Sequence, residues 1–185
     1  LRDKLRIIWN SAETENIASS VQDTGGLYFV PAFSGLAAPH WDQYARGMMI
    51  GITGGTSREH IVRAVLESIA FQVYDNAQVM EQDSGYSFSV MKADGGPVVN
   101  RFLMQFQADI IDAPVHRPQC VETTAMGAAY LAGLAVGYWN SKEDVIANWA
   151  IDKVFDPEMD DDNRKKLLKG WKKAVKCSYG WAKED

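Results

Sequence analysis

The sequence predicts an α/β fold in which helices pack against a sheet. First, short apolar runs bounded by glycine or proline alternate along the chain with longer amphipathic segments. Second, the composition of 46% hydrophobic and 23% charged residues, with a mean hydropathy of −0.23, is typical of a globular domain. Third, 185 residues can bury roughly 70% of the surface of the unfolded chain. We therefore expect a single domain over residues 1–185.

The beginning of the chain is expected to be helical. LRDKLRIIW has helical spacing at Leu1, Leu5 and Ile8 or Trp9, but no capping residue precedes it. This pattern is typical of a sequence that begins in the middle of a helix. We therefore expect the chain to be a piece of a longer protein. A second, polar helix is expected near residues 11–21.

Two strands and a long helix are expected next. GGLYFVPA at 25–32 and MMIGIT at 48–53 are short apolar runs, which favour buried strands. The helix begins after the capping pair Thr56 and Ser57 and ends at Gly85. Its buried stripe is expected to contain Ile61, Val65, Ile69, Val73 and Ala77.

The same helix carries Arg63 and Glu67 one turn apart. We expect an ion pair on its exposed side, worth a few tenths of a kcal/mol.

The alternation continues to the end of the chain. Residues 86–92 show the period of a strand, and a helix is expected after Gly96, with an apolar face at Phe102, Phe106 and Ile110. Three more helices are expected, over 121–138, 141–148 and about 161–179. The first contains a small-residue apolar run shorter than the roughly 20 residues of a bilayer span, so we interpret it as a buried helix.

The stretch KADGGPVVNRF, residues 92–102, joins the predicted strand to the next helix. Pro97 stands where a first helical residue is expected, and its missing amide costs nothing there. A helix start reached through Gly95 and Gly96 offers free amides and close backbone approach, which a phosphate or nucleotide needs. From the pattern alone a plain tight turn is favoured, because glycine pairs are common in any connection between a strand and a helix. Asn100 lies one turn later and either faces the same ligand or is a solvated polar residue.

A long loop, FSGLAAPHWDQYARG at 33–47, joins the first two strands and carries Phe33, Trp41 and Tyr44. We expect an ordered loop held by burial of these aromatic rings and by an ion pair between Asp42 and Arg46. The alternative is one wall of a substrate cleft.

Composition and charge exclude several classes of protein. The net charge of −5 and isoelectric point near 5.2 argue against a nucleic-acid platform. Cys120 and Cys177 form no CxxC motif, so neither a zinc site nor a disulfide framework is indicated. His40, His60 and His116 lack metal-ligand spacing, and structural roles are favoured for them.

The segment RKKLLKGWKKAVK at 164–176 predicts a basic amphipathic helix. Its apolar stripe contains Leu167, Trp171, Ala174 and Val175. An ordinary packed helix is favoured over a helix that binds a membrane surface or a calmodulin-type partner, because any surface helix needs a stripe of this width.

Three groups of segments carry a family resemblance. The first is GLYFVPAFSGLAAPHWDQYARG. The second is GMMIGITGGTSREHIVRAVLES, and the third is DGGPVVNRFLMQFQADI together with ETTAMGAAYLAGLAVGYW. They resemble the C-terminal part of the glycerol kinases, within the FGGY carbohydrate kinase family. The resemblance extends from the first residue to about Trp181 and is weaker over the last 35 residues.

The resemblance implies an actin-like ATPase lobe of the ribonuclease H-like type, with a mixed sheet flanked by helices. The chain would be most of the C-terminal nucleotide-binding lobe, and the N-terminal lobe would be missing. Gly96 and Asn100 would border the adenosine and α-phosphate of the nucleotide, and Gly95 would permit the backbone approach. The catalytic aspartate and the first phosphate loop would lie upstream, so neither a catalytic residue nor a metal ligand is expected in this chain.

The implied reaction transfers the γ-phosphoryl group of ATP, with Mg²⁺, to glycerol, giving glycerol 3-phosphate and ADP. The chain alone is expected to be inactive, with glycerol bound mainly by the missing lobe. The complete protein is expected to be a cytoplasmic homo-oligomer without a membrane span. The alternatives are a lobe of another FGGY sugar kinase and a non-catalytic actin-like module that binds nucleotide.

Overall fold

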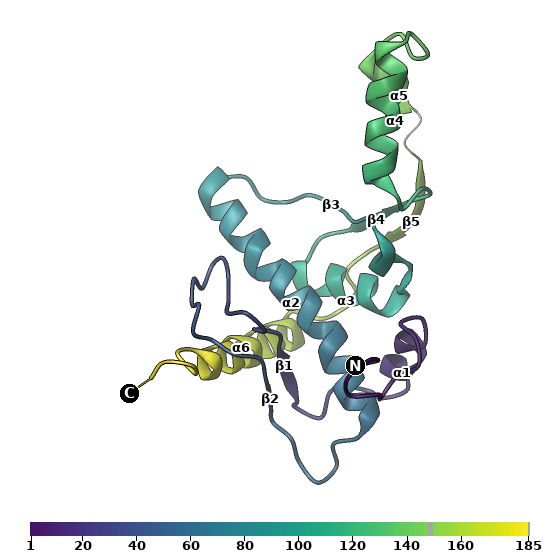
Figure 1. The fold of residues 1–185 in the computed structure, drawn as a ribbon. Helices are drawn as coiled ribbons and strands as arrows, with labels where there is room; N and C mark the ends of the chain where they lie inside the picture. The colour runs from purple at the N-terminus through teal and green to yellow at the C-terminus, as the bar shows by residue number, and fades with distance from the viewer. Residues whose placement is uncertain (148–149, 185) are drawn as a thin grey trace.

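The computed structural model describes residues 1–147 and 150–184 (Figure 1). The elements in chain order are α1 (Thr14–Ser19), β1 (Tyr28–Val30), β2 (Met48–Ile50), α2 (Arg58–Ser84), β3 (Met91–Lys92), the 3₁₀ helix η1 (Gly96–Val99), α3 (Arg101–Ile111), β4 (Val115–Pro118), α4 (Thr123–Ala135), α5 (Lys142–Ala147), β5 (Ile151–Phe155) and α6 (Asp161–Ser178).

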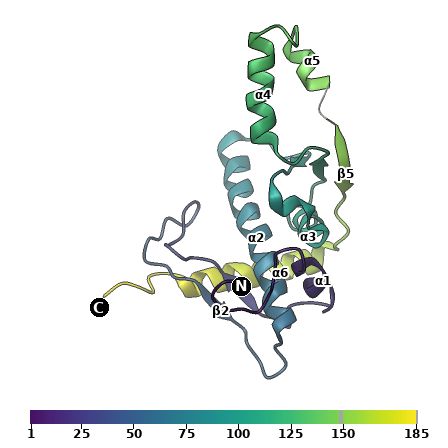
Figure 2. The same ribbon diagram turned by 45° about the vertical axis from the view of Figure 1, so that its right-hand side comes forward.

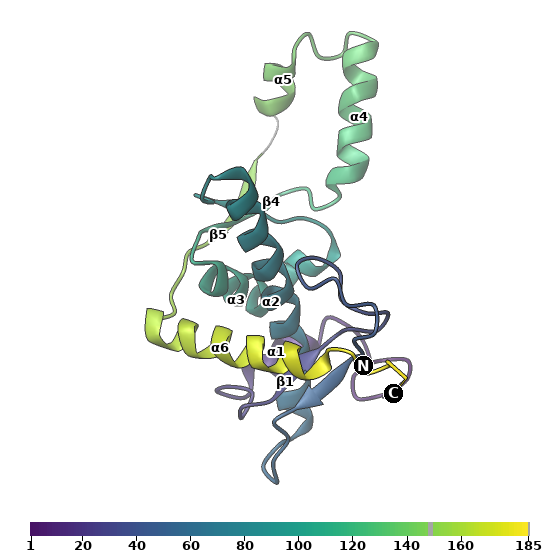
Figure 3. The ribbon, with the colours of Figure 1, turned by 90° about the vertical axis from the view of Figure 1, so that its left-hand side faces the viewer.

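The molecule consists of a packed body and a projecting arm (Figures 1 and 2). In the body, α2 packs against α1, α3 and β1, and α6 crosses the outer side over β1 and α3 (Figure 3). The arm is made of α4 and α5, which lie beyond the sheet of β3, β4 and β5. No helix within the described part of the chain is long and apolar enough to cross a membrane.

Two small sheets confirm the mixed α/β character. The strands β1 and β2 pair antiparallel, with Phe29 opposite Met49. In the other sheet the order is β3-β4-β5, with β3 parallel to β4 and β4 antiparallel to β5. The strands β4 and β5 are not predicted from the sequence, because VHRP and IDKVF are short and lack a clear period-2 pattern.

The long helix α2 begins and ends close to the predicted residues. Ser57 is its N-cap and forms a capping box with His60, while Gly85 ends it with a left-handed φ of 73°. Of the predicted buried stripe only Ala77 is buried, because the helix is covered on more than one side, between α1, α3 and β1. Val62 and Phe71 are buried, whereas Ile69 is exposed.

Aromatic stacking forms the centre of the core. The ring of Phe71 on α2 stacks on Trp171 of α6 at a centroid distance of 5.1 Å and an interplanar angle of 13°, and it meets Phe106 of α3 edge to face at 5.5 Å. The indole N–H of Trp171 donates to Asp75 at 2.8 Å. Phe71 therefore contacts the two helices that close the core around α2, and the predicted packed stripe of α6 is confirmed.

Arg63 and Glu67 form the predicted ion pair, but on the buried side of α2. Their Nε and Oε1 atoms are 2.8 Å apart, and the Glu67 side chain is 5% exposed. Arg63 also donates to the backbone carbonyl of Val21 and lies over the ring of Phe102. Burial raises the pKa of Glu67 to about 7, against the opposing effect of Arg63. Desolvation therefore outweighs the charge partner.

Two further predictions are wrong, and one is confirmed over the described residues. Residues 1–9 form turns instead of a helix, although Ile8 is buried as one face of such a helix would be. The strand predicted over 86–92 is reduced to Met91–Lys92, and Tyr86 is 81% exposed. The helix α5 matches the predicted 141–148, of which residue 148 lies outside the described residues.

The helix α4 matches the predicted range, but its predicted burial is wrong in this chain. Leu131 and Val136 are exposed, and Gly133 is its buried residue. The ring of Trp139 packs against Tyr130 and closely approaches Gly133. The apolar composition of α4 is typical of a buried helix. Burial also requires another surface that covers the helix, and in this chain Leu131 and Val136 are left exposed.

The packing of Trp171 leads to a test of the core. Trp171→Ala should lower the free energy of unfolding by about 3–5 kcal/mol, because it removes the ring stacked on Phe71. Trp171→Phe should cost less but still leave Asp75 without the indole donor. The measurement is urea denaturation of the chain, with Trp9→Ala as control. Trp9 is 86% exposed, so its loss should change stability by less than about 0.5 kcal/mol. Equal effects of the two alanine variants would contradict this packing.

The Arg63–Glu67 pair predicts how stability depends on pH. Because the folded-state pKa of Glu67 is raised from 4.5 to about 7, its contribution is fully present below pH 4.5 and is lost as the pH rises to 7. The loss should be on the order of 2–3 kcal/mol. Glu67→Gln should remove this slope, whereas Glu143→Gln on exposed α5 should retain it. Urea midpoints at several pH values measure the effect, and an unchanged slope in Glu67→Gln would refute it.

Candidate functional site

The turn at Gly95 and Gly96 follows β3, as predicted, and the two glycines have different roles. Gly95 has φ +82° and ψ 179°, a conformation that favours glycine, and its N–H donates to the Val121 carbonyl at 2.9 Å. Gly96 has no such φ, and a Cβ built on it would meet no atom within 4 Å. Gly95 therefore permits the turn, while Gly96 leaves open space beside the backbone.

The α-helix begins later than predicted. Gly96 to Val99 form the 3₁₀ helix η1, and α3 begins at Arg101 with Asn100 as its N-cap. The predicted immediate start of an α-helix at Pro97 is therefore wrong. Pro97 lies in the first turn of η1, where its missing N–H is tolerated.

The amide of Asn100 organises this helix start. Its Oδ1 accepts from the N–H of Leu103 at 2.9 Å, and its Nδ2 donates to Oγ1 of Thr14 on α1 at 3.2 Å. The N–H of Arg101 donates to Glu15 at 2.7 Å. These two N–H groups of α3 are satisfied by side chains of the chain itself, so the free-amide argument for phosphate binding does not apply to them.

A pocket of about 530 Å³ lies beside these residues. It is lined by Ser11, Ala12, Thr14, Glu15, Leu66, Ile69, Gly96, Pro97, Val99, Asn100 and Leu103. Its volume is within the range of small-molecule sites, and its walls combine aliphatic side chains with a few polar groups. Two predicted residues, Gly96 and Asn100, are therefore brought together at one concave site, while Gly95 supports the turn beside it.

Sequence reasoning missed the α1 side of this pocket. Thr14 and Asn100 are 86 positions apart in the chain and meet only through folding. Ser11 and Glu15 lie in a short polar segment without a motif. On the α2 wall, Leu66 was missed because it lies outside the predicted apolar stripe, whereas Ile69 belongs to that stripe but was expected to be buried.

The loop over 33–47 is ordered by other contacts than those predicted. Trp41 is 79% exposed and Phe33 is 75% exposed, so burial of these rings does not hold the loop. The backbones of Leu36 and Asp42 exchange two hydrogen bonds. The Asp42 carboxylate accepts from backbone N–H groups, first that of Gly180 and then those of residues 44 and 45, and these donors hold its pKa below the usual value.

Arg46, the predicted ion-pair partner of Asp42, donates instead to the carbonyls of Gln43 and Ala45.

His40 joins this loop to α2 and to the residue that follows α6. Its Nε2 lies 3.2 Å from Oδ2 of Asp75 on α2, and its Nδ1 lies 2.8 Å from the hydroxyl of Tyr179. Since the carboxylate only accepts, Nε2–H donates to it and Nδ1 accepts from Tyr179. Because the same carboxylate also accepts from Trp171, His40 has a structural role. Within the described residues, no group of three His, Cys, Asp or Glu side chains is placed to hold a metal ion.

Comparisons with known proteins define the class. The model of the FGGY family of carbohydrate kinases, C-terminal domain, matches residues 2–136. The chain belongs to this family. Solved structures of FGGY sugar kinases share its actin-like ATPase fold, including a ligand-bound xylulose kinase from Lactobacillus acidophilus with a TM-score of 0.77 and 25% identity over 97% of this chain and 37% of that one.

The most similar relatives include glycerol kinases. The chain is 58% identical over its whole length to a glycerol kinase of Agathobacter rectalis, and 60% identical over 99% of its length to glycerol kinase 2 of Thermotoga maritima. It spans 37% of each of these proteins. A Plasmodium falciparum glycerol kinase, solved with ADP, superimposes with a TM-score of 0.84 and 40% identity over 94% of this chain and 35% of that chain. The resemblance inferred from the sequence is thereby confirmed.

The geometry of Asn100 predicts an effect that needs no ligand. Asn100→Ala should lower the free energy of unfolding by about 1 kcal/mol, because the N-cap acceptor is lost. Asn100→Asp keeps an oxygen for the Leu103 N–H and should cost less, although it loses the bond to Thr14. Thermal and urea unfolding of the two variants without nucleotide provide the comparison. If both were as stable as the original chain, the amide would have no capping role.

Proposed function

We propose that this chain is the nucleotide-binding part of the C-terminal lobe of a glycerol kinase, and that the pocket beside Gly96 receives the adenosine of ATP. The observation that carries the proposal is that Gly96 and Asn100 border a single pocket of about 530 Å³. Support comes from the relatives named glycerol kinase over the whole chain and from the relative solved with ADP.

The pocket suits an adenosine chemically. Leu66, Ile69 and Leu103 offer aliphatic surface to the flat faces of a purine, and the lining also includes polar side chains. Asn100 already uses one N–H and one oxygen lone pair, so one N–H and one lone pair remain for a ligand. The bare backbone at Gly96 allows the sugar and α-phosphate to pass close to the chain.

Mg²⁺ enters this proposal only with the nucleotide. The ion prefers octahedral oxygen ligands and is commonly held by phosphates together with one or two carboxylates. Glu15 is the carboxylate lining the pocket, and the described residues contain no cluster for a dedicated metal site. The described residues therefore do not form a dedicated magnesium site.

The acceptor and the general base are proposed to lie outside this chain. Asp42 is occupied by three backbone N–H groups, and Glu67 is buried against Arg63, so neither is free to receive the proton of a hydroxyl. In the proposed reaction the chain binds and orients ATP. The remainder of the kinase places glycerol in line with the γ-phosphoryl group.

The uncovered side chains of α4 fit the same proposal. Leu131, Val136 and Tyr138 are large, apolar and exposed on the arm. We propose that they pack against a part of the kinase outside this chain, which is the larger share of the length of its relatives. The expected homo-oligomeric state and cytoplasmic location remain part of the proposal for the complete protein.

Gly96→Val in the complete kinase tests the site. The branched side chain should enter the pocket and raise the KM for ATP at least tenfold, while the fold is preserved because no atom lies within 4 Å of its Cβ. Gly54→Val is the matched control, since its Cβ also meets no atom within 4 Å and Gly54 does not line the pocket. Steady-state kinetics and calorimetric titration with Mg-ADP provide the readouts. A normal KM in a folded Gly96→Val enzyme would disprove the site.

The reaction is tested separately by acceptor specificity. The complete kinase should release ADP rapidly with glycerol and slowly with xylulose or gluconate. The last two compounds appear in the names of structural relatives of lower identity. The isolated chain should show no glycerol-dependent ADP release. A preference for xylulose would instead support another FGGY sugar kinase, and nucleotide binding without any acceptor would support a non-catalytic module.

A further inference from the structure

The charge of this acidic chain is distributed very unevenly. Residues 163–183 contain one arginine and seven lysines and no carboxylate. Since the whole chain carries −5, this stretch carries +8 and the remainder −13. A surface that served only solubility would mix both signs, so a block of one sign is informative.

Folding turns this block into one continuous surface. At 100° per residue, six lysines of α6 fall within an arc of about 120° on the helix. These residues, called here the lysine row, are Lys165, Lys166, Lys169, Lys172, Lys173 and Lys176, and all are exposed. The opposite side of α6 is buried through Trp171, Ala174 and Val175. The row therefore faces outward on the side of the body that α6 covers (Figure 3).

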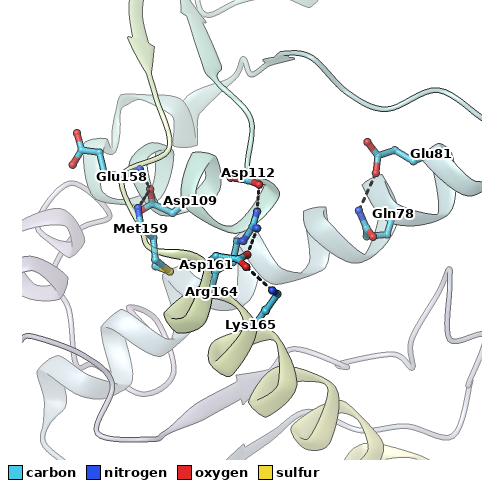
Figure 4. Close-up of polar contacts among 9 residues, drawn as sticks. All are labelled: Gln78, Glu81, Asp109, Asp112, Glu158, Met159, Asp161, Arg164 and Lys165. Atoms are coloured by element: carbon cyan, nitrogen blue, oxygen red, sulfur yellow. Dashed lines mark hydrogen bonds and ion pairs between the residues drawn. The ribbon is translucent and has the colours of Figure 1, made fainter.

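The lysine row is poorly neutralised by the rest of the protein. Arg164 is held between Asp112 and Asp161, and Lys165 pairs with Asp161 (Figure 4). These contacts use Asp161 at the beginning of α6 and Asp112 at the end of α3. Among the described residues, the other five lysines of the row have no carboxylate within ion-pair distance. Their ammonium groups are available to an external anion.

Exposed aromatic rings lie at the C-terminal end of the row. Trp181 is 70% exposed, and the chain around it is bonded to the loop through the N–H of Ala182 and the carbonyl of Tyr44. Trp41 of that loop is 79% exposed and lines the same hollow as Lys183. Tryptophan and lysine together are typical of surfaces that rest at the headgroup level of a bilayer.

We propose that the lysine row of α6, with Trp181 at its end, binds the surface of an anionic lipid bilayer. The helix lies flat on the headgroups without inserting, because its apolar side is already buried against Phe71 and its neighbours. The acidic remainder of the chain is repelled by the same surface, which orients the molecule with α6 toward the lipid.

A bilayer fits these features better than an acidic peptide does. The row consists of lysines, which are strongly hydrated point charges suited to a diffuse field of headgroups. It also lies on the convex outer surface of a helix, whereas a peptide needs a groove or a sheet edge to bind.

Vesicle sedimentation of the 185-residue chain tests this proposal. The chain should bind phosphatidylcholine vesicles that contain phosphatidylglycerol, bind vesicles of phosphatidylcholine alone only weakly, and dissociate as ionic strength rises. The triple substitution Lys169→Gln, Lys172→Gln and Lys176→Gln should reduce the partition coefficient on the order of 100-fold. Trp181→Ala should reduce it severalfold further.

A matched control separates the row from net charge. Lys4→Gln, Lys92→Gln and Lys142→Gln change the net charge equally at exposed positions away from α6 and should retain binding. Circular dichroism verifies that both triple variants are folded. Equal losses in the two variants, or equal binding to neutral vesicles through the apolar arm, would overturn the proposal. Absence of vesicle binding with row-dependent binding to immobilised polyglutamate would overturn it in favour of an acidic protein partner.

Discussion

The stacking of Phe71 on Trp171 is the contact on which the arrangement of the body depends. It joins the middle of α2 to the middle of α6, and through the edge of Phe106 it also includes α3. The Asp75 carboxylate adds a polar fixed point, since it accepts from both Trp171 and His40. Two stacked rings bury a large apolar area, while the hydrogen bonds determine one orientation of the indole. The core therefore has a defined geometry as well as a favourable burial energy.

The pocket is a consequence of this geometry. Because α2 is held from the α6 side, its opposite side presents Leu66 and Ile69 toward α1 and the start of α3. The bond between Asn100 and Thr14 joins those two segments, and both residues line the pocket. The same asparagine thus closes the helix start and borders the proposed nucleotide site. A residue with both roles links the stability of the lobe to ligand binding, since a ligand that uses its remaining donor and acceptor also stabilises the cap.

The two ends of the body differ in whether their charged groups are buried or exposed. Near α1, an ion pair is buried at the cost of desolvating Glu67, and Arg63 offsets only part of that cost. On the α6 side, Asp161 at the beginning of the helix and Asp112 at the end of α3 neutralise Arg164, while the lysines of the row other than Lys165 have no ion-pair partner among the described residues. The N-terminal end of α6 is the positive end of the helix dipole, which accounts for the acidic residues there. The dipole does not account for lysines along the whole outer side of the helix.

The sequence by itself determined a long helix that ends at Gly85, a helix with its apolar face at Phe102, Phe106 and Ile110, a helix near 161–179, the glycine turn and the family. These depend on local periodicity, capping residues and short motifs, all of which are read from neighbouring positions. Only the tertiary structure decided which side of α2 is buried, that Asn100 caps α3 while contacting α1, and that Gly96 faces a pocket instead of the body. The same holds for the exposed aromatic rings of the 33–47 loop and the uncovered α4, whose composition alone predicts burial. The physical reason is that burial and concavity are properties of surfaces brought together from distant parts of the chain, so no local pattern records them.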